Sequence, residues 1–375
     1  MALTDLIKRE ALGLGFDAVG ISRVDLSPQH SGPPSTPRPR SGSSLSEVEG
    51  STVLGALSPF LEFPRDPEAL EGSKGSDQPI LLPRLLYSRL REWLRRGYQG
   101  TMAWMERDPT RRADPLRVLP GARSVISVGM NYYTNQQADE RPGHGRIARY
   151  AWGQDYHTVL GERLEQLSSR IKSLAPSAET RWYVDTGPVM EKAWAQQAGL
   201  GWIGKHSNLV SERYGSWLVL GEILTSLELD PDEPGADLCG SCTLCIRACP
   251  TGAITEPYVV DARTCISYLT IELHQPGDAI PEDLAPKLGN RIFGCDDCLD
   301  VCPYNVNASA TSEPAFQPSP LTLAPRLSDL AESSEADFAT WFRQSPIRRA
   351  KHAGFLRNVR TALRNLKLPA TSRCS

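Results

Sequence analysis

Two runs of cysteine between residues 239 and 302 constrain this chain more than any other feature. The first run reads Cys239-Gly-Ser-Cys242-Thr-Leu-Cys245-Ile-Arg-Ala-Cys249-Pro. Its spacing, C-x2-C-x2-C-x3-C-P, is that of bacterial ferredoxins, in which three thiolates bind one [4Fe-4S] cluster and the fourth binds the other. The spacing therefore predicts a module that binds iron–sulfur clusters.

The second run, which ends in Cys302-Pro, has the spacing C-x2-C-x3-C-P and lacks one thiolate. Cys265 lies between the runs and brings the number of thiolates to eight, so its place rests on the count alone. We predict two [4Fe-4S] clusters. The first is assigned to Cys239, Cys242, Cys245 and Cys302, and the second to Cys249, Cys265, Cys295 and Cys298.

Zinc and disulfide bonds are the alternatives for these cysteines. Zinc ribbons use two separate C-x2-C pairs, not four cysteines in one short run. A disulfide framework requires an oxidising compartment, and the N-terminal residues lack the apolar segment of a signal peptide. We therefore expect a reducing cytoplasm. Cys374, the ninth cysteine, has no predicted role.

The totals allow two or three domains in 375 residues. A net charge of −3 gives no overall attraction to nucleic acid or to a membrane surface. No apolar run is long enough to span a bilayer, so we expect no membrane partner.

Hydrophobic periodicity predicts an α+β fold, in which an α/β-type domain is fused to a ferredoxin-like module and a short helical C-terminal segment. Helices are expected at 85–94, 156–174 and 189–198, and strands at 16–22, 124–133, 181–185 and 217–227. The predicted units are a catalytic domain at 1–26 and 82–230, a flexible low-complexity insertion at 27–81, a cluster domain at 231–307 and a helical segment at 308–375.

The last predicted helix is basic, and its role stays open between two interpretations. Either its charges form the solvated face of a docked helix, or they form a patch that faces phosphates. The residues are Arg348, Arg349, Lys351, Arg357, Arg360, Arg364 and Lys367.

Three shorter features are ambiguous taken alone. Gly199-Leu-Gly-Trp-Ile-Gly204 matches G-x-G-x-x-G, but a helix precedes it, so we expect close backbone approach and not a dinucleotide site. Asp185 ends a predicted strand, where a carboxylate is either catalytic or part of a turn. His157 and His206 lie beside glycine and aromatic residues, and each could equally be structural.

Together these blocks resemble one family, the epoxyqueuosine reductases, which are related to reductive dehalogenases. The matching segments include Met102-Ala-Trp-Met, Arg111-Arg-Ala-Asp-Pro, Ala148-Arg-Tyr-Ala-Trp-Gly-Gln-Asp-Tyr-His157, Val184-Asp-Thr-Gly-Pro, Gly199 to His206 and both cysteine runs.

The resemblance implies an oxidoreductase that reduces epoxyqueuosine to queuosine at the wobble position of tRNA, using two [4Fe-4S] clusters and cobalamin. It implies that Asp185 is the proton donor and that His157 lies in the same pocket. It also implies cobalamin contacts, although Asp296 could equally be a solvated turn residue beside Asp297. The implied contacts are Arg112, Ala148, Asp185, His206, Leu209, Leu220, Ser267 and Asp296.

Three further expectations follow from the resemblance. No D-x-H-x-x-G motif is present, so cobalamin is expected base-off without a histidine ligand from the protein. The insertion is foreign to the family pattern and no helical-repeat extension is present, so tRNA contact is expected from the cluster domain and the basic helix. The chain is expected to be a monomer served by an unidentified electron donor.

Two other functions compete with this one. A ferredoxin-type electron carrier for a partner enzyme would need neither cobalamin nor Asp185. Another corrinoid reductase, such as a reductive dehalogenase, would usually carry a twin-arginine signal, which this sequence lacks.

Overall fold

A computed structural model describes residues 2–24, 82–139, 141–273, 275 and 277–367. The predicted insertion at 27–81 and Cys374 lie outside the described residues. In the described part of the chain, no helix is both long enough and apolar enough to cross a membrane.

A four-stranded sheet with the order β1-β2-β7-β4 forms the centre of the first domain. Every pairing in this sheet is antiparallel. All eight residues of β2 are buried, so this strand is covered on both faces. Its β-branched residues are well suited to such a strand. The strands are β1 (Ala18–Arg23), β2 (Ser124–Asn131), β7 (Leu218–Thr225) and β4 (Thr180–Tyr183).

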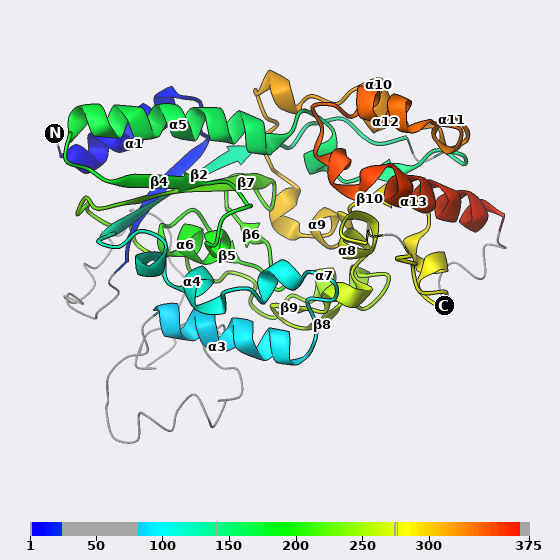
Figure 1. The fold of residues 1–375 in the computed structure, drawn as a ribbon, viewed down its shortest axis with the longest axis horizontal. Helices are drawn as coiled ribbons and strands as arrows, with labels where there is room; N and C mark the ends of the chain where they lie inside the picture. Colours follow the sequence, from blue (N-terminus) through cyan, green and yellow to red (C-terminus); the bar gives the residue numbers. More distant parts are fainter. Residues whose placement is uncertain (1, 25–81, 140, 274, 276, 368–375) are drawn as a thin grey trace, which may run out of the picture.

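Helices cover both faces of this sheet (Figure 1). On one face, α1 (Leu3–Gly13) and α5 (Tyr156–Leu174) pack apolar side chains such as Leu160 and Leu164 against Ile223 of β7. On the other face, α6 (Glu191–Gln197) buries Trp194 completely. Beyond α6 lie α3 (Leu82–Arg95) and α4 (Pro109–Ala113).

The mixed helix-and-sheet class predicted from the sequence is confirmed. Alternation of helices and strands along the chain did not produce a parallel sheet, however. The reason is that β2 pairs with both β1 and β7, which are far from it in sequence and run opposite to it.

The cysteine module is built from short elements around the two runs. Its helices α7 and α9 contact each other, and β10 pairs in parallel with β3 (Arg146–Ile147) of the first domain. The elements are α7 (Leu244–Ala248), β8 (Ile254–Glu256), β9 (Val259–Val260), α8 (Ile266–Ile271), β10 (Arg291–Phe293) and α9 (Asp297–Asp300).

The C-terminal helices pack onto both preceding units. Their core includes Phe342, Phe355 and Val359, which join Trp152 of the first domain and Phe293 of β10 in one apolar cluster. The helices are α10 (Pro320–Leu323), α11 (Leu327–Ala331), α12 (Glu335–Trp341) and α13 (Lys351–Leu366).

The predicted basic helix is α13, which begins at Lys351, so Arg348 and Arg349 lie in the preceding 3-10 turn (Pro346–Ala350). Arg349 is paired with Glu272. Arg357 is half-buried and donates to the carbonyls of Leu273 at 2.6 Å and Leu269 at 2.9 Å. The face is therefore not uniformly solvated, because Arg357 satisfies carbonyls at the end of α8.

Candidate active site

The structure gathers the seven cysteines of the two runs, together with Cys265, into two groups of four. Burial raises the pKa of Cys245 to about 11, and the neighbouring Cys239, Cys242 and Cys302 act in the same direction. Burial likewise raises the pKa of Cys298, and its neighbours are Cys295, Cys265 and Cys249. These are the groups assigned from the sequence; that each ligates one cluster stays a prediction.

The chemistry of both groups fits an iron–sulfur cluster. Four thiolates held close together would repel one another, and a positively charged iron core would offset this repulsion. No three His, Cys, Asp or Glu side chains in the described ranges converge closely enough to hold a single metal ion. The ligands of a cubane are spread over its corners, so this spacing does not disagree with cluster binding.

Asp185 lies in the loop after β4, in an unusual backbone conformation. Its φ of 55° is in the left-handed region, which non-glycine residues rarely adopt. Its Oδ2 accepts a hydrogen bond from the Tyr156 hydroxyl at 3.1 Å and lies 3.3 Å from Nε2 of His157. The side chain is 59% exposed, so it is accessible to a bound molecule.

His157 is held between two carboxylates at the start of α5. Its Nδ1 lies 2.7 Å from Oδ1 of Asp155, the residue that caps this helix. Burial acts to lower the pKa of His157, but the hydrogen bonds and charges of Asp155 and Asp185 outweigh it and raise the pKa to about 9. His157 is therefore protonated at neutral pH.

Asp185 is the ionised member of this pair. Burial acts to raise its pKa, but the hydrogen bond and charge of His157 and the hydroxyl of Tyr156 hold the pKa below the ordinary value for aspartate. Burial raises the pKa of Tyr156, which therefore remains a neutral donor. One proton is thus held by the Asp185–His157 pair.

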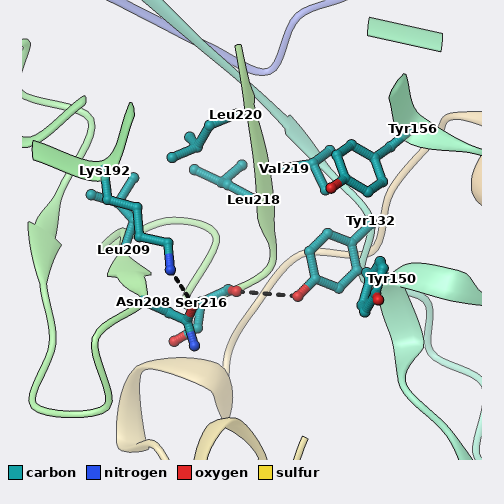
Figure 2. A pocket seen from close by; sticks show the side chains of 10 residues that line it. All are labelled: Tyr132, Tyr150, Tyr156, Lys192, Asn208, Leu209, Ser216, Leu218, Val219 and Leu220. Atoms are coloured by element: carbon teal, nitrogen blue, oxygen red, sulfur yellow. Dashed lines mark hydrogen bonds between the residues drawn. The ribbon is translucent and has the colours of Figure 1, made fainter. Parts of the chain in front are cut away.

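A cavity of about 170 Å³ lies beside this pair, and Figure 2 shows the residues that line it. Tyr156 links the two, because it lines the cavity and binds Asp185. Lys192 enters from the opposite side and donates to Oδ1 of Asn208 at 2.9 Å and to the carbonyl of Ser207 at 3.0 Å. The lining residues are Tyr132, Tyr150, Tyr156, Lys192, Asn208, Leu209, Ser216, Leu218, Val219 and Leu220.

Each cysteine group has one member near a residue that lines this cavity. The Ser216 hydroxyl lies within hydrogen-bond reach of the Cys302 thiol and acts to lower its pKa. On the other side, Cys298 lies close enough to Lys192 to act on the pKa of the ammonium. Electron-carrying groups held by the cysteines would therefore lie next to the cavity.

Two carboxyl groups beneath the site were missed by sequence reasoning. Glu191, at the start of α6, is close to Asp185, and burial raises its pKa to about 8. Glu222 on β7 is completely buried, and neither carboxylate oxygen has a hydrogen-bond partner among the described residues. The charged pair Glu191-Lys192, placed directly before the apolar run Ala193-Trp-Ala195, is the signal that could have pointed to the first of these.

His206 is neutral at physiological pH, because burial lowers its pKa to about 4. Its Nδ1 accepts from the backbone N–H of Asn208, and its Nε2 lies 3.4 Å from Oγ of Ser216. Of the residues expected to contact cobalamin, Leu209 and Leu220 line the cavity, and His206 adjoins it through Ser216.

The remaining expected contacts lie further out. Arg112 donates to the carbonyl of Gly187 in the Asp185 loop at 3.5 Å. Ala148 packs against Gly294, beside the second cysteine group. Ser267 is also at that group, where its backbone N–H reaches the Cys265 thiol.

Asp296 is not a solvated turn residue, so that alternative is wrong. It is buried, and its Oδ2 accepts from the backbone N–H of Arg149 at 2.7 Å. Burial raises its pKa to about 6.

The glycine-rich loop approaches the protein itself. A Cβ placed on Gly201 would lie 2.0 Å from the carbonyl oxygen of Val210, and one on Gly199 would lie 2.7 Å from that of Glu233. Gly201 thereby allows β5 (Trp202–Ile203) to pair with β6 (Leu209–Val210). We expected the backbone of this loop to approach another group closely. In the structure, that group is the backbone of the same chain, at Val210 and Glu233.

The lining of the cavity fits one face of a flat, largely apolar ring. Leucine and tyrosine side chains form most of the surface, and Lys192 and Asn208 provide polar contacts. The volume of about 170 Å³ is below the ~300–1,000 Å³ typical of ligand pockets. A corrin would therefore cover this cavity and not lie inside it.

A module with two groups of four cysteines beside a cavity with a proton-holding pair defines an iron–sulfur oxidoreductase. The protein-family model described as "Epoxyqueuosine reductase QueG, DUF1730" matches residues 112–186. The family model described as "4Fe-4S double cluster binding domain" matches residues 238–305. The epoxyqueuosine reductase of Synechocystis sp. is 48% identical over 276 residues, which are 73% of this chain and 94% of that protein. The chain belongs to the epoxyqueuosine reductase family.

Solved structures agree with this assignment. An epoxyqueuosine reductase bound to a tRNA-Tyr stem loop modified with epoxyqueuosine has a TM-score of 0.77 at 28% identity, covering 99% of this chain and 83% of that one. The enzyme from Bacillus subtilis, solved with its catalytic aspartate loop swung out of the active site, has a TM-score of 0.76 at 28% identity with the same coverage.

Proposed function

We propose that this oxidoreductase reduces epoxyqueuosine to queuosine in the wobble position of tRNA. One observation supports this most strongly: the protonated pair of Asp185 and His157 lies beside the same cavity that has a member of each cysteine group near its lining. The likeness to an enzyme solved with an epoxyqueuosine-modified stem loop supports the substrate.

The reaction requires both electrons and protons at one place. Reducing an epoxide to an alkene breaks two C–O bonds, forms a C=C bond and consumes two electrons and two protons, and the oxygen leaves as water. An acid beside the leaving oxygen lowers the barrier, because an alkoxide is a poor leaving group.

The protein's own residues would supply one of the two protons, and the other would come from water. Asp185 is exposed and would face the substrate, and His157, whose Nε2 lies 3.3 Å from Oδ2 of Asp185, would hold the proton behind it. We propose that the proton passes from Nε2 of His157 through Oδ2 of Asp185 to the leaving oxygen. Tyr156 donates to the same carboxylate oxygen and keeps it in position. This refines the expected role of Asp185, since its pKa is lowered and the stored proton resides on His157.

We propose cobalamin as the group that covers the cavity, held base-off without a protein histidine. When bound, it would supply a strongly reducing metal centre that receives electrons one at a time from the clusters. Leu209 and Leu220 would support the ring, Lys192 and Asn208 would bind its polar edge, and neutral His206 would remain behind Ser216.

The setting of the enzyme is inferred from the same residues. Eight cysteines that are free in the structure suit a reducing cytoplasm. Exposed basic residues of α13, such as Arg360 and Arg364, are candidates for contact with tRNA phosphates. We expect a monomer that is reduced by a separate electron donor.

Anaerobic turnover of tRNA that carries epoxyqueuosine tests the proposal. The protein, with both clusters present, is incubated with reductant with and without cobalamin, and the digested nucleosides are measured by mass spectrometry. Loss of one oxygen mass only when cobalamin is present is the expected result.

The alternatives give different results in the same experiment. Cobalamin binding without conversion would indicate another corrinoid reduction. Neither binding nor conversion, with intact clusters, would indicate an electron carrier.

A further inference from the structure

Lys205 connects the cavity side of the molecule to the first cysteine group. It lies between β5 and β6, next to His206, and is only 9% exposed. Its ammonium donates to the carbonyl of Gly240 at 2.5 Å and to the carbonyl of Cys242 at 2.9 Å. The side chain therefore reaches into the loop that carries Cys239 and Cys242.

The backbone of Lys205 is bound to the same region. Its N–H reaches the Cys239 thiol and acts to lower the pKa of that thiol. Its carbonyl accepts from the N–H of Tyr258 at 3.0 Å. The hydroxyl of Tyr258 in turn donates to Asp237, whose other carboxylate oxygen accepts from the N–H of Cys239 at 2.8 Å. Lys205 is thus fixed relative to the cysteines from two sides.

The ammonium of Lys205 is nearly buried beside this group, and the carboxylate of Asp237 is a charge of opposite sign next to Cys239. Both acceptors of its ammonium are neutral carbonyl oxygens, so these hydrogen bonds do not cancel the charge. A nearly buried charge is screened less by solvent than an exposed one. The reduction of an iron–sulfur cluster adds a negative charge, and its potential depends on the net charge and the hydrogen bonds around the sulfurs.

We propose that the Lys205 ammonium tunes the reduction potential of the first cluster, making this cluster easier to reduce. Lys205 is a positioning residue and does not touch the reacting atoms of the substrate. The inference rests on the cluster-binding part of the proposed function and does not depend on the tRNA substrate.

Redox titration of the full-length protein, with both clusters reconstituted under anaerobic conditions and followed by electron paramagnetic resonance, tests this proposal. Lys205→Gln keeps an N–H donor and removes the charge. We expect one of the two midpoint potentials to become more negative, with at least a tenfold change in the reduction equilibrium, which is 59 mV for a one-electron couple.

Two further variants serve as controls. Lys205→Arg keeps the charge and should stay near the wild-type potential. Arg247→Gln removes an exposed charge two residues after Cys245, so solvent screening should make its effect smaller. Iron content is measured for every variant, so that loss of a cluster is not mistaken for a shift in potential.

Two outcomes would overturn the proposal. One is an unchanged pair of potentials in Lys205→Gln with full iron content. The other is a failure of both Lys205→Gln and Lys205→Met to retain the first cluster while Lys205→Arg retains it, which would make Lys205 an assembly residue only. Because no tRNA is present, neither outcome bears on turnover.

Discussion

Nε2 of His157 lies 3.3 Å from Oδ2 of Asp185, and the direction of proton transfer depends on which of the two side chains holds the proton. In the folded protein His157 holds the proton, since two carboxylates flank its ring. Asp185 remains ionised and exposed, ready to pass the proton on. The acid is therefore the pair and not the carboxyl group alone.

Asp185→Asn should abolish most of the turnover and leave the fold and both clusters in place. An amide cannot relay the proton, and loss of a general acid typically costs about 10²–10⁴-fold in rate. Single-turnover conversion of the modified tRNA measures the loss, with iron content and cobalamin absorbance as controls. Wild-type turnover in this variant would contradict the assignment.

The pH dependence of turnover should follow His157. Its pKa in the folded protein, about 9, is above the ordinary value of 6.5. Below about pH 8 the pair keeps its proton and the rate should be flat, and above about pH 9 the rate should fall as the proton is lost. His157→Gln should be slower and should lack this descending limb; a limb of unchanged position in that variant would exclude His157 as its source.

At the scale of single elements, α13 connects the cysteine module to the C-terminal helices. Asn358 is completely buried on this helix and donates to the carbonyl of Thr270 on α8 at 2.8 Å and of Ile292 on β10 at 3.0 Å. Each acceptor is the backbone of an element next to a predicted cluster ligand. The helix is therefore part of the support of the second cysteine group.

Asn358→Leu should lower the free energy of unfolding strongly, although Asn and Leu side chains are similar in size. It leaves two buried carbonyls without this donor, at about 1–3 kcal/mol each. Chemical denaturation measures the free energy of unfolding, and Arg360→Gln on the exposed face of α13 is the matched control, with an expected change within about 0.5 kcal/mol. Equal stabilities of the two variants would contradict this role for Asn358.

Glu222, in the central sheet, should make the free energy of unfolding depend on pH. Burial raises its pKa well above the ordinary value of 4.5. Below pH 4.5 both states are protonated and stability is unaffected; as pH rises, the unfolded state ionises first and the free energy of unfolding falls. Glu222→Gln should therefore lose less stability than wild type between pH 5 and 8 in urea denaturation. Parallel losses would show that Glu222 is not the source.

The sequence patterns predicted most elements because each depends on local periodicity. Helix α5 begins and ends at the predicted residues, Tyr156 and Leu174, since an Asp155 cap precedes a regular apolar stripe. The cysteine spacing predicted the cluster module for the same local reason. By contrast, the partner of the glycine-rich loop, the carbonyl contacts of Arg357 and the burial of Glu222 depend on segments that are distant in sequence.

At the scale of the whole molecule, the second cysteine group connects separate units. Cys298 packs against the core of the first domain, and Cys265 and Cys295 pack in a core with α8. Each proposed cluster also joins cysteines from both runs, and the second includes Cys265 from the segment between them. Cluster binding should therefore hold units together as well as carry electrons.

Removal of the clusters should lower the thermal stability of the whole chain. Ligand binding present only in the folded state adds to the free energy of folding, and we expect the Tm to fall by about 10 °C or more. Circular dichroism of the anaerobic cluster-loaded protein and of the chelator-treated protein measures this. Reconstitution should restore the Tm, and identical Tm values before and after treatment would contradict a structural role for the clusters.

The left-handed backbone of Asp185 has an evolutionary consequence. A non-glycine residue in this region costs about 1–3 kcal/mol, and glycine would adopt the same conformation without that cost. A laboratory selection for heat resistance alone would therefore favour glycine at this position and discard the carboxylate. Selection for queuosine formation would oppose the same substitution. Thermal stability and enzymatic activity therefore favour different residues at position 185.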